Sequence, residues 1–376
     1  MNAGFKISFC TVCMNRLHHL RQTLPENIKD NLDYGQLEFV LLDYNSQDGL
    51  EQWINSEFTD ALASGRLKYF KTREPGSFNM AHSRNMVTHV ATGDIVCLID
   101  ADNYTGPGFA TFVNDAFSRN RQIFLTAISR TVVKNPSDVL GRICVMKTDF
   151  AKVTGFDEFM TSYGFEDYDL VNRLQLSGLR RKIIEQNYLR AISHPREERT
   201  RHMMLKKKFH RLFIHQVEPC RSEVLFLFSD YTFSLGTLVN DHTRIKMSLK
   251  HLITDRKTKY EDRITAEDWT KGTWTEQHGT LILTMDTPAD PIAFTIADDL
   301  KYLRRKAVEF FAVPPHSYLI DDLILFHSVI SNRNRMSANL KRKIVSPNER
   351  GFGLGTVYKN FDYENPIQTG VTQVSL

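Results

Sequence analysis

The sequence has few cysteines, little net charge and no long apolar run, and each of these absences excludes a class of protein. No apolar stretch approaches the roughly 18 residues that a membrane-spanning helix needs. Five cysteines in 376 residues do not suggest a disulfide framework. The net charge of +4, from 48 basic and 44 acidic residues, permits an anionic partner but does not predict nucleic acid. Residues 1–6 lack the pattern of a secretory signal, so we expect a cytoplasmic protein, with peripheral contact at the inner face of the membrane or with polysaccharide machinery as the alternative.

The loop after the first expected strand contains no glycine. Residues 11–16 read Thr-Val-Cys-Met-Asn-Arg, whereas nicotinamide-dependent dehydrogenases carry Gly-x-Gly-x-x-Gly there. Nucleotidyltransferases that act on sugar phosphates would be expected to carry a glycine-rich, basic loop at the same place. Neither class is therefore the leading interpretation.

Cys10 and Cys13 form a Cys-x-x-Cys pair without a second such pair elsewhere. A structural zinc site normally needs four ligands. Side chains three apart on a strand point to opposite faces, which also disfavours a shared ligand. We interpret the two cysteines as small buried side chains, with a redox or metal role as the alternative.

Strand-like and helix-like segments alternate through the first half of the chain. This alternation predicts an α/β fold with a mostly parallel sheet. The strands read as continuous apolar runs, as expected when helices cover both faces. Ligand sites in such folds lie beyond the carboxyl ends of the strands. The expected strands are residues 6–12, 37–43, 67–71, 95–100 and 123–128, with helices at 16–28 and 78–91 between them.

The second half has a different texture. Basic and apolar residues alternate over 201–216, which predicts a basic amphipathic helix or linker that packs on the catalytic domain or contacts a polyanion. Strand composition follows from residue 222 and predicts a smaller, mostly antiparallel domain. The expected organisation is a catalytic domain at 1–204, the linker or helix at 205–221, a β-rich accessory domain at 222–300, and a helical segment with a loop-rich tail at 301–376.

Asp100 and Asp102 follow an apolar strand as Asp-Ala-Asp. Two carboxylates at this spacing suit a hard divalent cation, Mn²⁺ or Mg²⁺, that also takes diphosphate oxygens. An Asp-x-Asp turn alone is a weak signal, because acidic turns after strands are common. The motifs around it make the signal stronger.

Five motifs in order resemble the nucleotide-sugar-dependent glycosyltransferases of the GT-A fold, closest to the inverting family 2 type. The Gly-Phe-Glu-Asp-x-Asp-Leu segment also looks like the acceptor-site motif of β1,4-galactosyltransferases and bacterial chondroitin-type polymerases. The resemblance covers about 200 residues and leaves out the β-rich domain. The five motifs lie at residues 11–20, 43–49, 81–85, 100–102 and 164–174.

The resemblance implies a role for each residue on the donor side. Thr11, Asp43 and Arg84 would form the nucleoside pocket, and a carboxylate such as Asp43 suits the imide N–H of uracil. An intrachain salt bridge is the alternative for Arg84. Asp100 would lie near the ribose and the metal. The implied metal ligands are Asp100, Asp102 and His194, with His202 as the alternative to His194.

On the acceptor side, the resemblance implies that Asp167 is the base and that Glu166 holds the acceptor. Asp169 is an alternative base, and stabilisation of a helix N-terminus is an alternative account of all three carboxylates. Phe165 and Tyr163 would contact the acceptor sugar. Phe165 stands where the galactosyltransferase-type motif prefers Gly, so the donor sugar cannot be carried over from that family.

Taken together, the sequence predicts a metal-dependent inverting hexosyl- or N-acetylhexosaminyltransferase. It would move a sugar from a UDP-sugar to a hydroxyl of a glycan, in the synthesis of a bacterial capsule or similar surface polysaccharide. The alternative is an inactive transferase that serves as a scaffold or glycan-binding subunit. The joint presence of Asp100, Asp102, Glu166 and Asp167 argues against that alternative.

Overall fold

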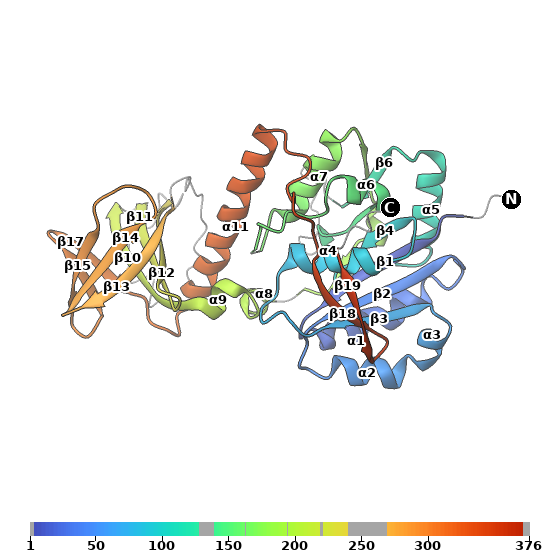
Figure 1. Ribbon diagram of the computed structural model, residues 1–376, viewed down its shortest axis with the longest axis horizontal. Coiled ribbons are helices and arrows are strands. Elements are labelled where there is room, and N and C mark those ends of the chain that lie inside the picture. Colours follow the sequence, from blue (N-terminus) through green and yellow to red (C-terminus); the bar gives the residue numbers. More distant parts are fainter. Residues whose placement is uncertain are drawn as a thin grey trace. The chain divides into compact units, whose positions relative to one another are not determined.

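The computed structural model describes residues 4–127, 139–161, 163–193, 195–218, 221–239 and 269–370. The chain divides into two compact units, Met1–Pro195 with Arg335–Leu376, and Arg196–Asn334 (Figure 1). The first unit is therefore formed from two separate stretches of sequence. His194, which the sequence suggested as a metal ligand, lies outside the described residues.

The first unit contains a nine-stranded sheet with the strand order β19-β18-β3-β2-β1-β4-β7-β6-β8. The pairs β1–β2, β2–β3, β1–β4 and β6–β8 are parallel, and β7 is antiparallel to both of its neighbours. The strands are β1 (Ile7–Cys13), β2 (Leu37–Tyr44), β3 (Leu67–Thr72), β4 (Ile95–Leu98), β6 (Ile123–Thr126), β7 (Ile143–Met146), β8 (Arg180–Ile183), β18 (Gly355–Lys359) and β19 (Asp362–Thr369). In a separate small sheet, β5 (Asn103–Tyr104) pairs with β9 (Arg190–Ala191). The short helix η2 (Gln186–Tyr188) directly precedes β9 in the chain.

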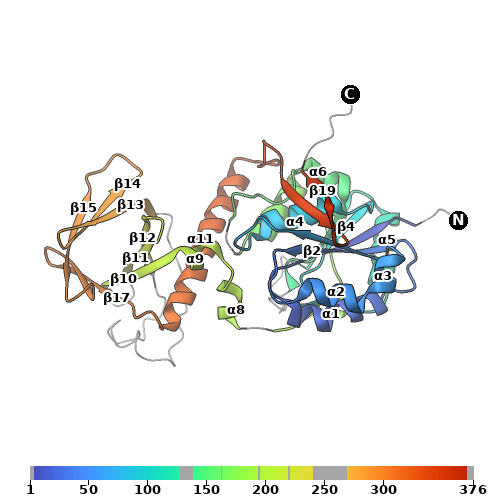
Figure 2. The ribbon, with the colours of Figure 1, turned by 60° about the horizontal axis from the view of Figure 1, so that its bottom comes forward.

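Helices cover both faces of this sheet, as the apolar strands predicted. Helices α1 and α2 pack with α5 on one face, and α4, α6 and α7 pack on the other. Figure 2 shows α1 and α2 on one side of the sheet and α4 and α6 on the opposite side. The helices of this unit are α1 (Leu17–Lys29), α2 (Leu50–Glu57), α3 (Thr59–Ala63), α4 (Met80–Val90), α5 (Phe109–Arg119), α6 (Lys147–Lys152) and α7 (Glu166–Leu176). The predicted α/β fold with a mostly parallel sheet is confirmed.

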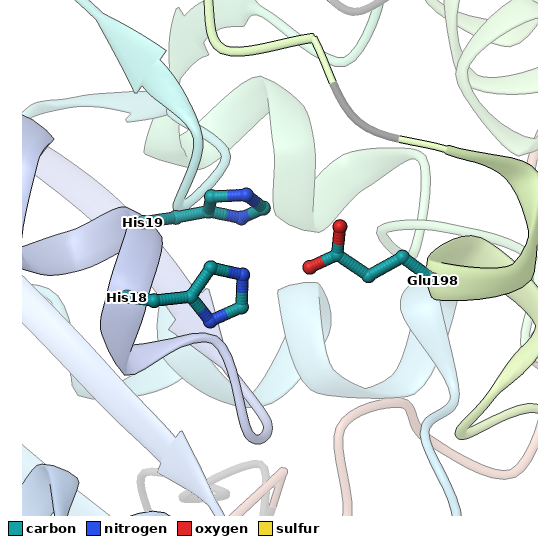
Figure 3. A group of neighbouring side chains, drawn as sticks. All are labelled: His18, His19 and Glu198. Atoms are coloured by element: carbon teal, nitrogen blue, oxygen red, sulfur yellow. The ribbon is translucent and has the colours of Figure 1, made fainter.

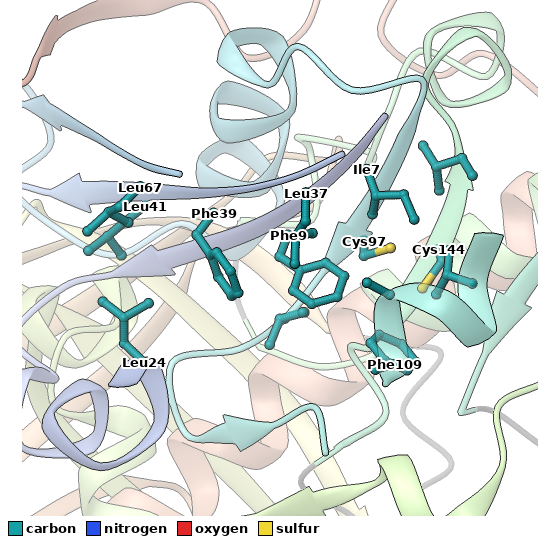
Figure 4. Close-up of a cluster of buried hydrophobic side chains, with 14 of the residues drawn as sticks. Ile7, Phe9, Leu24, Leu37, Phe39, Leu41, Leu67, Cys97, Phe109 and Cys144 are labelled. Carbon is teal, nitrogen blue, oxygen red and sulfur yellow. The ribbon is translucent and has the colours of Figure 1, made fainter. Parts of the chain in front are cut away.

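Neighbouring residues of one strand belong to different cores. Phe9 and Cys13 of β1 lie in the core that also contains Phe39 and Phe109 (Figure 4). Cys10 lies in the core on the opposite face. Burial raises the pKa of the Cys10 and Cys13 thiols well above the ordinary value. Both are thus protonated, buried side chains, which agrees with the interpretation as small core residues.

The tail adds two strands to the edge of the sheet. β18 pairs antiparallel with β3, and the hairpin of β18 and β19 turns through Asn360 and Phe361. Both turn residues have positive φ, 47° and 68°. A two-residue turn with positive φ at both positions matches the right-handed twist of a hairpin. The expected tail of 301–376 thus contains ordered strands that complete the sheet of the first unit.

The second unit contains a closed barrel of antiparallel strands, β10 to β17. The strand composition of this region predicted a mostly antiparallel domain, but not its closure into a barrel. The barrel closes where β10 pairs with β17. Its strands are β10 (Phe209–Glu218), β11 (Arg221–Phe228), β12 (Thr232–Val239), β13 (Thr270–Gln277), β14 (Thr280–Met285), β15 (Ile292–Ala297), β16 (Tyr302–Arg305) and β17 (Val308–Ala312). Two short helices, α8 (Arg196–Thr200) and α9 (Met204–Lys208), precede the barrel, and α11 (Tyr318–Lys341) follows it.

The segment expected as a basic helix or linker is mainly strand β10. Phe213 lies in one core of the unit, whereas Leu212 and Ile214 pack in a second core with residues of α11. Leu212, Phe213 and Ile214 form a short continuous apolar run, and such a run does not distinguish a strand from a segment of buried helix. No helix among the described residues has both the length and the apolarity needed to cross a membrane.

Candidate active site

The carboxyl ends of three adjacent parallel strands bring the predicted donor-side residues to one edge of the sheet. Thr11 lies near the end of β1, Asp43 near the end of β2, and Asp100 two residues after β4. Because β1 lies between β2 and β4, the three positions share one rim. This is where open α/β sheets bind ligands. Thr11 and Asp100 are half-buried, whereas Asp43 is fully buried.

Asp43 is held by two neighbours. Tyr69 donates its hydroxyl to Oδ2 at 2.6 Å, and the backbone N–H of Ser46 donates to Oδ1 at 2.7 Å. The ammonium of Lys71 lies 3.6 Å from Oδ2. Burial raises the pKa of Asp43, and the hydrogen bonds and Lys71 oppose that rise. The carboxylate is therefore fixed in direction before any ligand arrives.

Arg84 on α4 is the hub of the site. Its guanidinium is 4% exposed and binds Asp100 through Nη2 and Asp167 through Nη1, both at 2.6 Å. Glu166 Oε1 lies 3.7 Å from Nη1. Burial lowers the pKa of Arg84, but these ion pairs raise it by more, so the pKa lies above its ordinary value. The salt-bridge alternative suggested for Arg84 is thus present, and it connects the donor-side and acceptor-side carboxylates.

Glu166 and Asp167 open α7. The residue before them, Phe165, has a left-handed backbone with φ of 65°, which a glycine would adopt at low cost. Burial, together with the charge of Asp167, raises the pKa of Glu166 to about 8. Burial also raises the pKa of Asp167, which Arg84 opposes. Glu166 Oε2 is buried and has no hydrogen-bond partner among the described residues.

Asp169 lies one turn into α7, and both of its carboxylate oxygens accept hydrogen bonds from other residues of the chain. Its Oδ2 accepts from Arg173 Nε at 2.6 Å and its Oδ1 accepts from Asn339 Nδ2 at 3.0 Å. The side chain is 1% exposed. This engagement favours Asp167 over Asp169 as the residue that meets a substrate.

Hydrogen bonds from two residues that the sequence analysis did not single out, Asn103 and Arg142, stabilise the Asp-x-Asp loop. Asn103 donates to Asp102 Oδ1 at 2.7 Å, and Arg142 Nη2 donates to Asn103 Oδ1 at 3.0 Å. Arg142 is fully buried, and burial lowers its pKa to about 10. A Cβ at Gly141 would come within 2.5 Å of Asp100 Oδ2. No motif marks Gly141 or Arg142, because their role arises from the way β7 pairs with β4.

The donor set at this loop fits a divalent cation. Asp100 is 29% exposed and Asp102 is half-buried, so both can meet a ligand from solvent. Their oxygens are the hard ligands that Mn²⁺ and Mg²⁺ take. The missing side chain of Gly141 allows the guanidinium of Arg84 and the carboxylate of Asp100 to lie close to the backbone of this residue.

The remaining predicted residues are placed as follows. Tyr163 is half-buried two residues before Phe165, and the Phe165 and Tyr168 rings lie 5.6 Å apart. His202, the alternative ligand, belongs to the second unit. Figure 3 shows the imidazoles of His18 and His19 on α1, which lie within the first motif but were not singled out as site residues; their ring centroids are 4.1 Å apart. The figure also draws Glu198, a residue of the second unit.

The residues that form this rim lie within the matches to two protein-family models. Residues 8–156 match the model of "Glycosyl transferase family 2", and residues 123–208 match that of the "N-terminal domain of galactosyltransferase". A comparison with curated protein sequences found no match. Together the two family models span the five motifs and the rim described above.

Three solved structures illustrate the similarity. A mannosyltransferase from Pyrobaculum calidifontis in complex with GDP-Man and Mn²⁺ is 19% identical over 55% of this chain and 64% of its own, with a TM-score of 0.42. S. aureus TarS in complex with UDP-GlcNAc is 16% identical over 50% and 59%, with a TM-score of 0.41. GalNAc-T7 with UDP, GalNAc and Mn²⁺ is 14% identical over 49% and 43%, also at 0.41. The chain spans less than two thirds of each of these structures.

The assignment rests on the two family models and on the agreement of the sheet with the expected architecture. The matched residues contain all the carboxylates of the rim as well as Arg84. The first unit therefore contains a domain similar to family 2 glycosyltransferases over residues 8–156, and its sheet has the α/β architecture expected of the GT-A fold.

Proposed function

We propose that the protein is an inverting, metal-dependent glycosyltransferase that moves a sugar from a UDP-sugar to a hydroxyl of a glycan acceptor. The observation that carries this proposal is the pairing of Asp100 and Asp167 with one buried guanidinium, that of Arg84. A transferase must hold its donor and its catalytic base close to each other. Arg84 meets this requirement, because its two ion pairs hold the loop of Asp100 next to Asp167 at the N-terminus of α7.

On the donor side, Asp43 accepts the imide N–H of uracil and thereby favours UDP over purine nucleotides. Its fixed direction, held by Tyr69 and Ser46, supports this role. Thr11 lies next to it along the rim and contacts the nucleoside. Of the three solved structures described above, one is in complex with GDP-Man, one with UDP-GlcNAc and one with UDP, so the nucleotide base differs among them.

Asp100 and Asp102 hold Mn²⁺ or Mg²⁺ together with the diphosphate. When bound, the divalent ion stabilises the charge of the leaving nucleoside diphosphate. Asp102 is oriented for this task by Asn103. A third protein ligand is expected at His194, which lies outside the described residues.

On the acceptor side, Asp167 accepts the proton of the attacking hydroxyl. Burial raises the pKa of Asp167 and the ion pair with Arg84 opposes that rise, while its side chain is 13% exposed, so a substrate can reach it. Glu166 carries a proton near neutral pH because its pKa is raised to about 8. Its buried Oε2, which lacks a partner among the described residues, is available to bind the acceptor. Attack from the face opposite the leaving group gives inversion in one displacement.

The acceptor is proposed to be a growing surface polysaccharide of the capsule type, with Phe165 and Tyr163 packing on its sugar ring. An inactive scaffold or glycan-binding subunit is the second candidate. The complete set of carboxylates on the rim favours activity. Glycan binding by the barrel is compatible with both.

The test is release of free nucleotide from UDP-, GDP-, CMP- and dTDP-sugars with Mn²⁺, with Mg²⁺ and with EDTA. Asp102→Ala and Asp167→Asn should lose turnover, and Asp60→Asn, an exposed residue of α3, is the matched control. Turnover of a UDP-sugar that EDTA abolishes would support the proposal. Binding of UDP without turnover of any sugar by the wild type, with acceptor glycans present, would favour the scaffold, and binding of no nucleotide would exclude the transferase.

A further inference from the structure

The hairpin of β18 and β19 contacts the strand that supports Asp43. The turn residue Asn360 exchanges two hydrogen bonds with the backbone of Tyr69: its N–H donates to Tyr69 O at 2.8 Å, and its Oδ1 accepts from Tyr69 N at 3.0 Å. The neighbouring turn residue, Phe361, stacks on the Tyr69 ring with centroids 5.0 Å apart and planes at 27°. Backbone and ring of Tyr69 are thus both held by the turn.

Tyr69 in turn holds Asp43. Its hydroxyl donates to Asp43 Oδ2 at 2.6 Å, and both side chains are fully buried. The two residues lie on adjacent strands, and Tyr69 pairs with Leu41, two positions before Asp43. A change in the χ1 torsion of Tyr69, or a shift of its backbone, would therefore move the hydroxyl away from the carboxylate.

A second chain of contacts runs from the same hairpin to the same carboxylate. Tyr363 donates its hydroxyl to Glu51 on α2. Glu51 binds Lys71 at 2.7 Å, and Lys71 faces Asp43 Oδ2 at 3.6 Å. The guanidinium of Arg73 lies 3.8 Å from the centroid of the Tyr363 ring and fixes it further. Both chains end at Oδ2.

The backbone at the turn also points to a specific role. A bulky residue rarely adopts positive φ, and Phe361 does so at 68°. Asn-Gly is the favoured pair for such a turn, and Asn360 already fills the first position. A phenylalanine in the second position is costly for the turn itself, so its ring must contribute elsewhere. Its ring packs against the core that contains Tyr69, and it stacks on the Tyr69 ring itself.

We propose that the β18–β19 hairpin is part of the nucleotide site, and that Phe361 is a positioning residue which orients Asp43 toward the base through Tyr69. This inference rests on the proposed function, because it takes Asp43 as the residue that binds uracil. The hairpin thus sets the affinity for the base without touching the ligand. The diphosphate and metal end of the site does not depend on it.

The experiment is calorimetric titration of wild type and Phe361→Gly with UDP and with inorganic pyrophosphate, both in the presence of Mn²⁺. The substitution creates the favoured Asn-Gly turn, so the hairpin is expected to form and Tm to stay close to that of the wild type. We expect UDP to bind about three- to tenfold more weakly, as for the loss of one well-oriented hydrogen bond. Pyrophosphate has no base, so its affinity should not change.

Two further variants separate positioning from general stability. Phe361→Tyr keeps a ring on Tyr69 and should bind UDP like the wild type. Ile367→Ala removes an exposed side chain from the same hairpin and should have no effect on either ligand. Tyr69→Phe keeps the stack on Phe361 and loses the hydroxyl, so it should weaken the binding of UDP as Phe361→Gly does.

The outcomes are distinguishable. Wild type that binds pyrophosphate but no pyrimidine nucleotide contradicts the proposed donor, and hence the proposed function. Wild type that binds UDP, together with Phe361→Gly that binds it equally well, overturns the inference alone. Equal weakening of UDP and pyrophosphate also overturns it, because it would show that the hairpin supports the whole site without selectivity.

Discussion

Arg84 Nη1 lies 2.6 Å from Asp167 Oδ1, in a position where both side chains are largely buried. The same guanidinium binds Asp100 through its other terminal nitrogen. A lysine ammonium cannot reproduce this planar, two-sided geometry. The position of the base relative to the donor loop therefore depends on one side chain.

Arg84→Lys should lower kcat by about 100-fold, because the base and the donor loop lose their common partner. Breaking a buried ion pair should also lower the free energy of unfolding by about 3 kcal/mol. Nucleotide release and urea unfolding measure the two effects. Arg119→Lys, at an exposed position of α5, is the matched control. An Arg84→Lys variant with wild-type turnover would show that the pairing has no catalytic role.

The stability of the protein should depend on pH through Glu166. Its pKa is raised from 4.5 to about 8, so between these values the folded protein holds a proton that the unfolded chain has lost. The free energy of unfolding should therefore fall as pH rises from 4.5 to 8, by up to about 1.4 kcal/mol per pH unit. Glu166→Gln should remove this slope. Urea unfolding of both proteins at pH 5, 6.5 and 8 gives the difference, and parallel profiles would refute the assignment.

Arg142→Met should weaken Mn²⁺ binding about tenfold or more, because Asn103 would no longer be held against Asp102. Electron paramagnetic resonance of free Mn²⁺ measures this without any turnover. Arg173→Met removes another fully buried arginine, one that binds Asp169. It should lower the stability and leave Mn²⁺ affinity unchanged. The same loss of Mn²⁺ affinity in both variants would mean that general destabilisation is the cause.

At Phe165, a glycine variant should be more stable than an alanine variant by about 1 kcal/mol, because the backbone is left-handed with φ of 65°. Both variants lose the contact with Tyr168, so the comparison isolates the backbone. Thermal and urea unfolding of the two variants measure the difference. Equal stability would show that the residue does not keep this conformation in solution.

The core of the fold and most of the rim could be predicted from the sequence because their signals are local. An apolar strand followed by Asp100-Ala101-Asp102 places those carboxylates at a strand end without any knowledge of the rest. The acidic start of α7 is likewise visible as Glu166-Asp167. The alternation of strand and helix then predicts a mostly parallel sheet, and the carboxylates that follow its strands are expected at the same edge of that sheet.

What could not be predicted depends on pairing between distant segments. Arg142 supports the Asp-x-Asp loop only because β7 runs antiparallel beside β4. The turn at Asn360 and Phe361 contains no glycine, so nothing in the tail indicated a hairpin. β10 was expected as a helix or linker because its basic and apolar residues were interpreted as an amphipathic pattern, whereas Leu212, Phe213 and Ile214 are divided between two cores on opposite faces of a strand.

The two-part composition of the first unit has a consequence for biosynthesis. Chains leave the ribosome from the N-terminus, and domains fold as their last segment emerges. Residues 196–334 are made before 355–370, so the barrel can fold while the outer edge of β3 still lacks β18. An uncovered strand edge invites pairing with other chains. The nascent protein is therefore most prone to aggregate, and most in need of chaperones, during the interval in which the barrel is complete and the transferase sheet is not.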